Sequence, residues 1–118
     1  MDEKMLKQRT KRLGIAVIGL VDKLPRTMAA EILAKQIVRS STSVGANYRA
    51  ACRAKSTPDM INKLKTVEEE ADETAYWLEV LTESKILNQT QVVPLAKETD
   101  EILAMTVASI KTLRGRKS

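Results

Sequence analysis

An acidic stretch, VEEEADE at residues 67–73, holds residue types that could support metal-dependent chemistry. Glu73 follows Glu70 by three residues and Glu69 by four, so the three carboxylates share one side of a helix, with Asp72 beside them. Carboxylates that converge in this way bind Mg²⁺ when substrate phosphates complete its coordination. The stretch therefore raises one enzymatic hypothesis, a Mg²⁺-dependent hydrolase.

The same stretch is similar to half of the motif of all-α nucleotide pyrophosphohydrolases of the MazG type. That resemblance implies a second acidic helix, but the last predicted helix offers only Glu98, Asp100 and Glu101 near its start. A motif without its confirming context carries a high risk of a false match. We therefore rank the hydrolase third among three functions and expect that the protein is not an enzyme.

Residues for other kinds of catalysis are scarce. The chain has no histidine, the commonest general base and metal ligand, and its four glycines are too scattered to form a phosphate-binding loop. Arg49 and Arg53 lie near the single cysteine, Cys52, and could lower its pKa, although a lone cysteine beside alanines is more often a small core residue. We expect no catalytic residue, no metal site and no cofactor.

Composition predicts one soluble domain over residues 1–118, with 43% hydrophobic, 30% charged and 3% aromatic residues. A single cysteine allows no intrachain disulfide, as is usual in a reducing compartment. There is no signal-peptide pattern, and the longest apolar run, residues 15–21, is too short to span a bilayer. We expect a cytoplasmic protein that has no membrane partner.

Positive charge is the main functional signal, with a formal net charge of +5. Residues 66–84 carry seven acids and no base, whereas bases gather where the second predicted helix ends, the third begins and the fourth ends. These bases are Arg49, Arg53, Lys55, Lys63, Lys65, Lys111, Arg114, Arg116 and Lys117, against Asp59 alone. The first helix adds Lys4, Lys7, Arg9, Lys11 and Arg12 alongside.

This charge pattern favours binding of RNA or DNA through the phosphate backbone. No aromatic residues are interleaved for base stacking, so we expect electrostatic binding with little sequence preference. The alternative is a solvated rim that only keeps the protein soluble.

Helix-capping and helix-breaking residues, together with the hydrophobic periodicity, predict four helices, near 4–22, 26–55, 58–86 and 91–113. Pro25, Pro58 and Pro94 lie near helix starts, Thr57 reads as an N-cap, and Gly115 as a terminal C′ residue. Apolar or small residues recur at spacings of three and four along each helix. The predicted seams are Leu13, Ala16, Val17 and Leu20; Leu33, Ile37, Ser40, Val44, Asn47 and Ala51; Leu64, Val67, Ala71, Thr74, Leu78 and Leu81; and Val92, Leu95, Thr99, Ile102, Thr106, Ile110 and Leu113.

Seams of this kind, joined by short connections, are typical of an up-and-down antiparallel four-helix bundle. Ile15, Ile18 and Val21 make the first helix apolar around most of its circumference, and Trp77 stands beside the third seam. Extra apolar surface of this kind predicts a homo-oligomer interface. The alternative is a wide stripe that faces the core of a monomer.

The segment SVGANYRAACRAKS at residues 43–56 places small and polar residues within a helix. Antiparallel folding about Ser56 sets residues whose numbers sum to about 112 at one height. This register predicts a polar seam of Ser40, Ser43 and Asn47 with Glu70 and Glu73, including a hydrogen bond from Ser43 or Asn47 to Glu70. We interpret the seam as a packing device, with a ligand site as the alternative.

The combination QIVRSSTSVGANYRAACRAKS followed by KLKTVEEEADETAYWLEVL resembles a bacterial four-helix-bundle family, the proteins encoded in ribosomal-RNA intervening sequences. The centre of the resemblance is Ser43 with Asn47, and Glu70 with Glu73. The shared frame also includes Leu24, Pro25, Gln36, Arg39, Ser40, Ser56, Lys63, Leu64, Trp77 and Leu78. Many relatives carry a glutamate three residues after the asparagine, where this chain has Ala50.

The resemblance implies a homopentamer of bundles without catalytic activity. A related branch includes the accessory variability protein of diversity-generating retroelements, a basic pentamer that binds nucleic acid and a reverse transcriptase. Our leading hypothesis is therefore a non-enzymatic oligomeric module that binds nucleic acid, as an accessory to a reverse transcriptase or other enzyme. The second is a purely structural or protein-interaction bundle whose basic end meets an acidic protein.

Overall fold

Four side-chain caps set the starting points of four helices. The side chains of Asp2, Thr27, Ser56 and Asn88 each accept a hydrogen bond from a backbone N–H in the following turn. The computed structural model describes residues 2–116 and contains α1 (Glu3–Val21), α2 (Met28–Ala51), α3 (Thr57–Glu83) and α4 (Gln89–Gly115). No strand occurs within those residues, and the predicted all-α four-helix bundle is confirmed.

The helix ends correct several assignments made from the sequence. Ser56 caps α3 in place of the predicted Thr57, and Pro58 lies within the first turn. The predicted range 26–55 is too long for α2, because Thr27 caps its start and Cys52 caps its end. Gly115 is the last residue of α4 and not a left-handed C′ residue, since no glycine among residues 2–116 has a positive φ.

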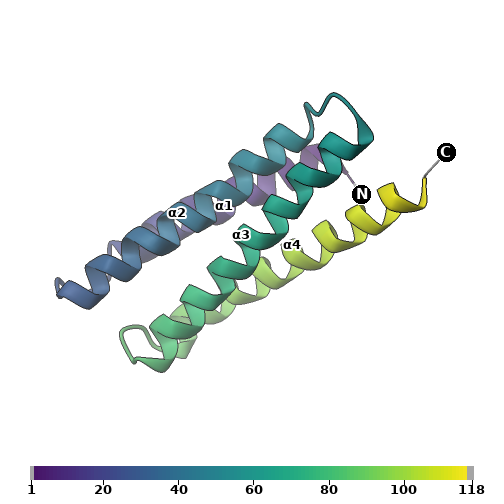
Figure 1. The fold of residues 1–118 in the computed structure, drawn as a ribbon. Coiled ribbons are helices and arrows are strands. Elements are labelled where there is room, and N and C mark those ends of the chain that lie inside the picture. The colour runs from purple at the N-terminus through teal and green to yellow at the C-terminus, as the bar shows by residue number, and fades with distance from the viewer. Residues whose placement is uncertain (1, 117–118) are drawn as a thin grey trace.

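The helices follow one another up and down the bundle (Figure 1). α1 packs on α2, α2 on α3 and α3 on α4, while the contact between α1 and α4 is the sparsest of the four. The resulting bundle is slender, measuring 52 × 21 × 20 Å. The starts of α1 and α3 therefore lie at the same end as the ends of α2 and α4 (Figure 1).

The predicted seams supply most of the core. Every residue of the third seam is buried, from Leu64 to Leu81. In α1, however, Ala16 is exposed, while Leu6 and Thr10 extend the buried stripe toward the N-terminus. The buried threonines each donate to a carbonyl four residues earlier, so no buried side-chain polar atom of the described residues lacks a partner.

Two glycines let α1 and α2 approach closely. A Cβ atom on Gly45 would lie 3.2 Å from the carbonyl oxygen of Thr10 and 3.3 Å from the amide nitrogen of Lys11. A Cβ atom on Gly14 would lie 3.2 Å from Cγ2 of Thr42. The absence of two side chains thus sets the distance between these helices.

Arg9 clamps the sparse contact between α1 and α4. Its Nε atom donates to Oε2 of Glu98 at 2.8 Å, and its Nη2 atom donates to Oε1 of Glu101 at 2.8 Å. The hydrogen bond from Arg9 lowers the pKa of Glu98. Sequence periodicity did not identify this clamp, because it joins polar residues that flank the two seams.

Replacing Arg9 by glutamine is expected to lower the free energy of unfolding by about 2 kcal/mol at pH 7, because it removes charge-assisted hydrogen bonds at a partly buried site. The folded-state pKa of Glu98 is depressed, so this contribution is present above the unfolded-state pKa and disappears as pH falls through the folded-state value. Denaturant unfolding from pH 7 down to about 3 should show the difference between wild type and variant shrinking below pH ~4.5.

Lys7→Gln is the matched control, because Lys7 pairs with Glu3 at 3.5 Å on an exposed surface. We expect that control to change stability by less than about 0.5 kcal/mol. A difference for Arg9→Gln that persisted unchanged to pH 3 would contradict the role of the Glu98 carboxylate.

Candidate nucleic-acid interface

One end of the bundle collects bases from three segments. The turn after α2, the first turns of α3 and the last turns of α4 meet there (Figure 1). We define the cationic pole by its six residues: Lys55, Lys63, Lys65, Lys111, Arg114 and Arg116. All are exposed except Lys63, which is half-buried. Lys117, also predicted here, lies outside the described residues.

The acids at this end already have partners within the chain. Asp59 accepts the backbone N–H of Lys55 and the Nζ of Lys63, each at 3.1 Å, and these bonds lower the pKa of its carboxyl. The start of α1 adds Asp2, which caps the helix, and Glu3, which pairs with Lys7. The start of α1 thus raises the number of acids at this end from one to three, and it also brings the bases Lys4 and Lys7. Lys55, Lys65, Lys111, Arg114 and Arg116 nevertheless make no ion pair within residues 2–116.

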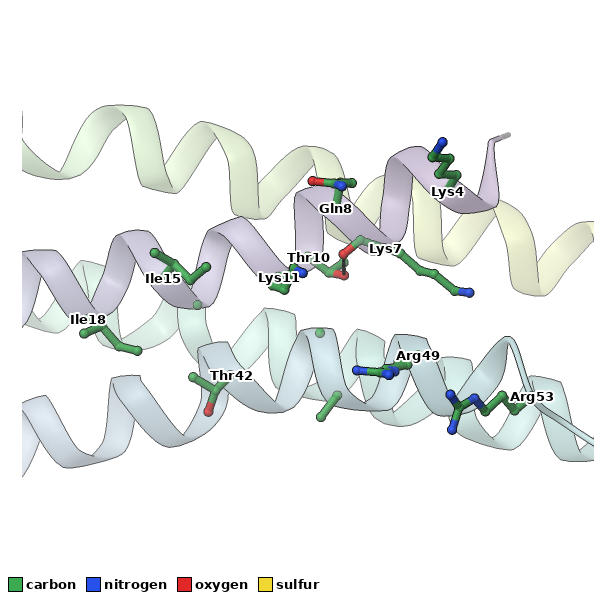
Figure 2. A pocket seen from close by; sticks show the side chains of 13 residues that line it. Lys4, Lys7, Gln8, Thr10, Lys11, Ile15, Ile18, Thr42, Arg49 and Arg53 are labelled. Atoms are coloured by element: carbon green, nitrogen blue, oxygen red, sulfur yellow. Dashed lines mark hydrogen bonds between the residues drawn. The ribbon is translucent and has the colours of Figure 1, made fainter.

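Arg49 and Arg53, which the sequence groups with Lys63 and Lys65, lie at the same end of the bundle but on its α1–α2 side. There they line a groove of about 530 Å³ between α1 and α2. We call this the cationic groove, because its other charged lining residues are Lys4, Lys7 and Lys11 of α1, with no acid among them. Figure 2 shows Lys7 extending between the helices on the side where Arg49 and Arg53 lie.

The cationic groove is apolar at its far end. Its lining also includes Gly14, Gly45 and Ala46. Ile15 and Ile18 lie at the end away from Arg53, with Thr42 across from them on α2 (Figure 2). These isoleucines are 59% and 45% exposed. Gly14 and Gly45 belong to the lining of the groove, and at both positions the neighbouring helix already lies in contact.

The predicted interface residues separate into two places. Ile15 and Ile18 face the groove, whereas Val21 and Trp77 are half-buried and pack against the core. The Trp77 indole donates to Oε2 of Glu73 at 2.9 Å. This bond and the packing against the core fix the orientation of the half-buried Trp77 ring within its own bundle.

The polar seam differs from the predicted arrangement. Asn47 donates its Nδ2 to the carbonyl and hydroxyl oxygens of Ser43, at 2.9 and 2.8 Å, so the predicted bond to Glu70 is wrong. The bond across the seam instead joins the Thr74 and Ser40 hydroxyls, at 2.9 Å. The side-chain amide of an asparagine can donate to the residue four positions earlier on its own helix, and this partner is nearer than a carboxylate on the neighbouring helix.

Arg39 binds the two glutamates that the sequence had assigned to the seam. Its guanidinium donates to Glu70 at 3.3 Å and also to Glu73. The bonds from Trp77 and Arg39 lower the pKa of Glu73. The predicted register could have identified the Arg39–Glu73 pair, because 39 and 73 sum to 112 and the two residues therefore lie at the same height. Within residues 2–116 no group of three or more acids, cysteines or histidines lies close enough to hold a metal ion.

Cys52 is half-buried where α2 ends. Burial is the main cause that raises the pKa of its thiol, and the neighbouring Glu3 adds to the shift. The sequence had left open a lowered pKa from Arg49 and Arg53, but neither arginine is among the groups that shift the pKa of this thiol. Cys52 is therefore packed as a small core residue rather than activated as a thiolate.

Comparison with known proteins agrees with this bundle. The family model described as 23S rRNA-intervening sequence protein matches residues 3–108. A crystal structure of a protein of unknown function from the S23 ribosomal protein family of Bacteroides thetaiotaomicron VPI-5482 is 33% identical, with a TM-score of 0.87. The match covers 94% of this chain and 99% of that one. No curated protein matches the sequence.

None of the helices over residues 2–116 is long and apolar enough to cross a bilayer. The family match extends from the start of α1 into the last third of α4 and includes Arg39, Glu70 and Glu73. The chain belongs to the 23S rRNA-intervening sequence protein family.

Proposed function

We propose that this protein is a non-enzymatic, homo-oligomeric module of the cytoplasm that binds nucleic acid through the phosphate backbone at its cationic pole. The observation that carries the proposal is five exposed bases without ion pairs at one end of the bundle, where each nearby acid is already bonded. The family description names these proteins after an intervening sequence of 23S rRNA, and this supports the choice of RNA as the partner.

The chemistry of the pole favours binding without sequence recognition. Lysine and arginine side chains that neutralise phosphates release counterions from the nucleic acid, and this supplies affinity for any sequence. Base stacking would need exposed aromatic rings at the pole, but Tyr48 is buried, and the exposed Tyr76 lies two turns before the end of α3, on the far half of that helix from the pole. A module of this kind suits an accessory role beside a nucleic-acid enzyme such as a reverse transcriptase.

Replacing Lys55, Lys65 and Lys111 together by glutamine is expected to weaken binding of every RNA or DNA sequence about equally, by at least about tenfold at 50 mM salt. The log–log dependence of affinity on salt should flatten by about 2 to 3 on duplex DNA, because three phosphate contacts are lost. Fluorescence anisotropy with labelled duplex and single-stranded RNA and DNA, at several salt concentrations, measures both effects.

The matched control replaces Lys23, Lys35 and Lys97, which are also exposed lysines but lie away from the pole, so the net charge changes equally. Its affinity and salt dependence should stay close to those of the wild type. An equal loss in both variants would show that only net charge matters and would contradict the site. No binding by the wild type at 50 mM salt would contradict nucleic-acid binding and favour the protein-interaction bundle.

A further inference from the structure

The cationic groove combines two kinds of surface that one phosphate strand would not cover together. Its first half carries Lys7, Lys11 and Arg49, and its second half carries the exposed side chains of Ile15 and Ile18. A nucleic-acid backbone would satisfy the bases but leave the isoleucines in water. A helix with acids around an apolar residue matches both halves, in the manner of an amphipathic helix that binds in a groove.

The outward face of α3 has this composition. Its exposed positions recur at spacings of three and four on the side opposite the buried seam. We define the acidic stripe by its five residues: Glu69, Asp72, Tyr76, Glu79 and Glu83. Tyr76 is its single apolar member, 55% exposed, with its ring held edge-on against Trp77.

We infer that the cationic groove receives the acidic stripe of a second copy of this chain. The spacing of the two surfaces agrees along the helix axes. From Ile18 to Lys11 the groove advances seven residues, or about 10.5 Å, and from Tyr76 to Glu69 or to Glu83 the stripe advances the same distance. With Tyr76 over Ile15 and Ile18, acids therefore reach the bases for either direction of the docked helix.

The available surface is also sufficient for such a contact. The chain exposes 7323 Å², whereas a typical folded monomer of this mass exposes about 6,400 Å². The excess, roughly 900 Å², covers one partner's share of a single standard interface, about 800 Å², whereas each chain of a closed ring contributes two such shares. The contact is heterologous, because groove and stripe belong to different faces, so it builds a ring when its rotation closes.

The inference rests on the oligomeric part of the proposed function and goes beyond it by naming the two surfaces in contact. It does not depend on the nucleic-acid part. Docking uses Lys7, Lys11 and Arg49 of the groove, whereas phosphates are assigned to Lys55 and Lys65 of the pole. The two can therefore be tested separately in one preparation, with assembly measured in the absence of nucleic acid.

Two charge-reversal variants test the contact. The groove variant carries Lys11→Glu and Arg49→Glu, and the stripe variant carries Glu69→Lys, Asp72→Lys, Glu79→Lys and Glu83→Lys. Each alone brings like charges together, so light scattering should show the mass fall to the 13.1 kDa monomer at micromolar concentration. Mixing the two variants should restore a larger assembly, because every groove then meets a stripe of opposite charge.

The control for folding and net charge is Lys35→Glu with Lys97→Glu, which should assemble like the wild type, and circular dichroism checks that each variant is helical. A groove variant that stays oligomeric would overturn the inference while leaving the nucleic-acid proposal untouched. A groove variant that keeps its assembly but loses RNA binding would assign the groove to phosphates. A monomeric wild type would overturn both the inference and the oligomeric part of the proposed function.

Discussion

Replacing Gly45 by leucine is expected to lower the free energy of unfolding by about 3 kcal/mol. The added Cβ would meet backbone atoms of Thr10 and Lys11 at 3.2 and 3.3 Å, and backbone cannot rotate away as a flexible side chain can. The remainder of the leucine would force α1 away from α2 and disrupt the floor of the cationic groove. Denaturant unfolding followed by circular dichroism measures the loss.

Gly19→Ala is the matched control on α1. Nothing lies within 4 Å of a Cβ atom built on Gly19, so alanine meets no neighbour and gains helix propensity. We expect this variant to be more stable by about 0.5–1 kcal/mol. Destabilisation by both substitutions, to a similar extent, would show that the close crossing at Gly45 is not what limits the side chain there.

Replacing Ile37 by alanine is expected to cost about 2–5 kcal/mol, because a fully buried side chain is lost and a cavity remains. Ile37 is 0% exposed and lies in the main hydrophobic cluster. Such a loss is a large part of the 5–15 kcal/mol by which domains of this size are usually stable. Unfolding in urea, analysed with the same m-value for both proteins, gives the difference in unfolding free energy between wild type and variant.

Ile32 on the same helix supplies the comparison, since it is 54% exposed. Ile32→Ala removes the same atoms but leaves no cavity, and we expect a change of at most about 0.5 kcal/mol. An equal loss at both positions would mean that the seam of α2 is not where periodicity places it.

Sequence patterns predicted the number of helices and their order, and they identified the whole buried seam of α3 but only part of the seam of α1. Leu64 to Leu81 could be assigned from spacing alone, because a helix buries one stripe whatever its neighbours are. The antiparallel register of α2 and α3 could also be predicted, because the short turn between them lets one helix slide little along the other. In that register Arg39 lies level with Glu73, which it binds, whereas Ser40 bonds to Thr74, two residues beyond the position that the register assigns to it. The family resemblance rested on residues of the same seam.

The three-dimensional packing of the helices sets how polar side chains are shared between them. It placed Arg49 and Arg53 in a groove with Lys7 and Lys11, while Lys65 remained at the pole. Long side chains on the flanks of a seam can reach either neighbouring helix, and periodicity does not distinguish the two. The choice depends on how each helix is rotated about its axis and how closely pairs cross, and at α1 and α2 the missing side chains of Gly14 and Gly45 set that distance.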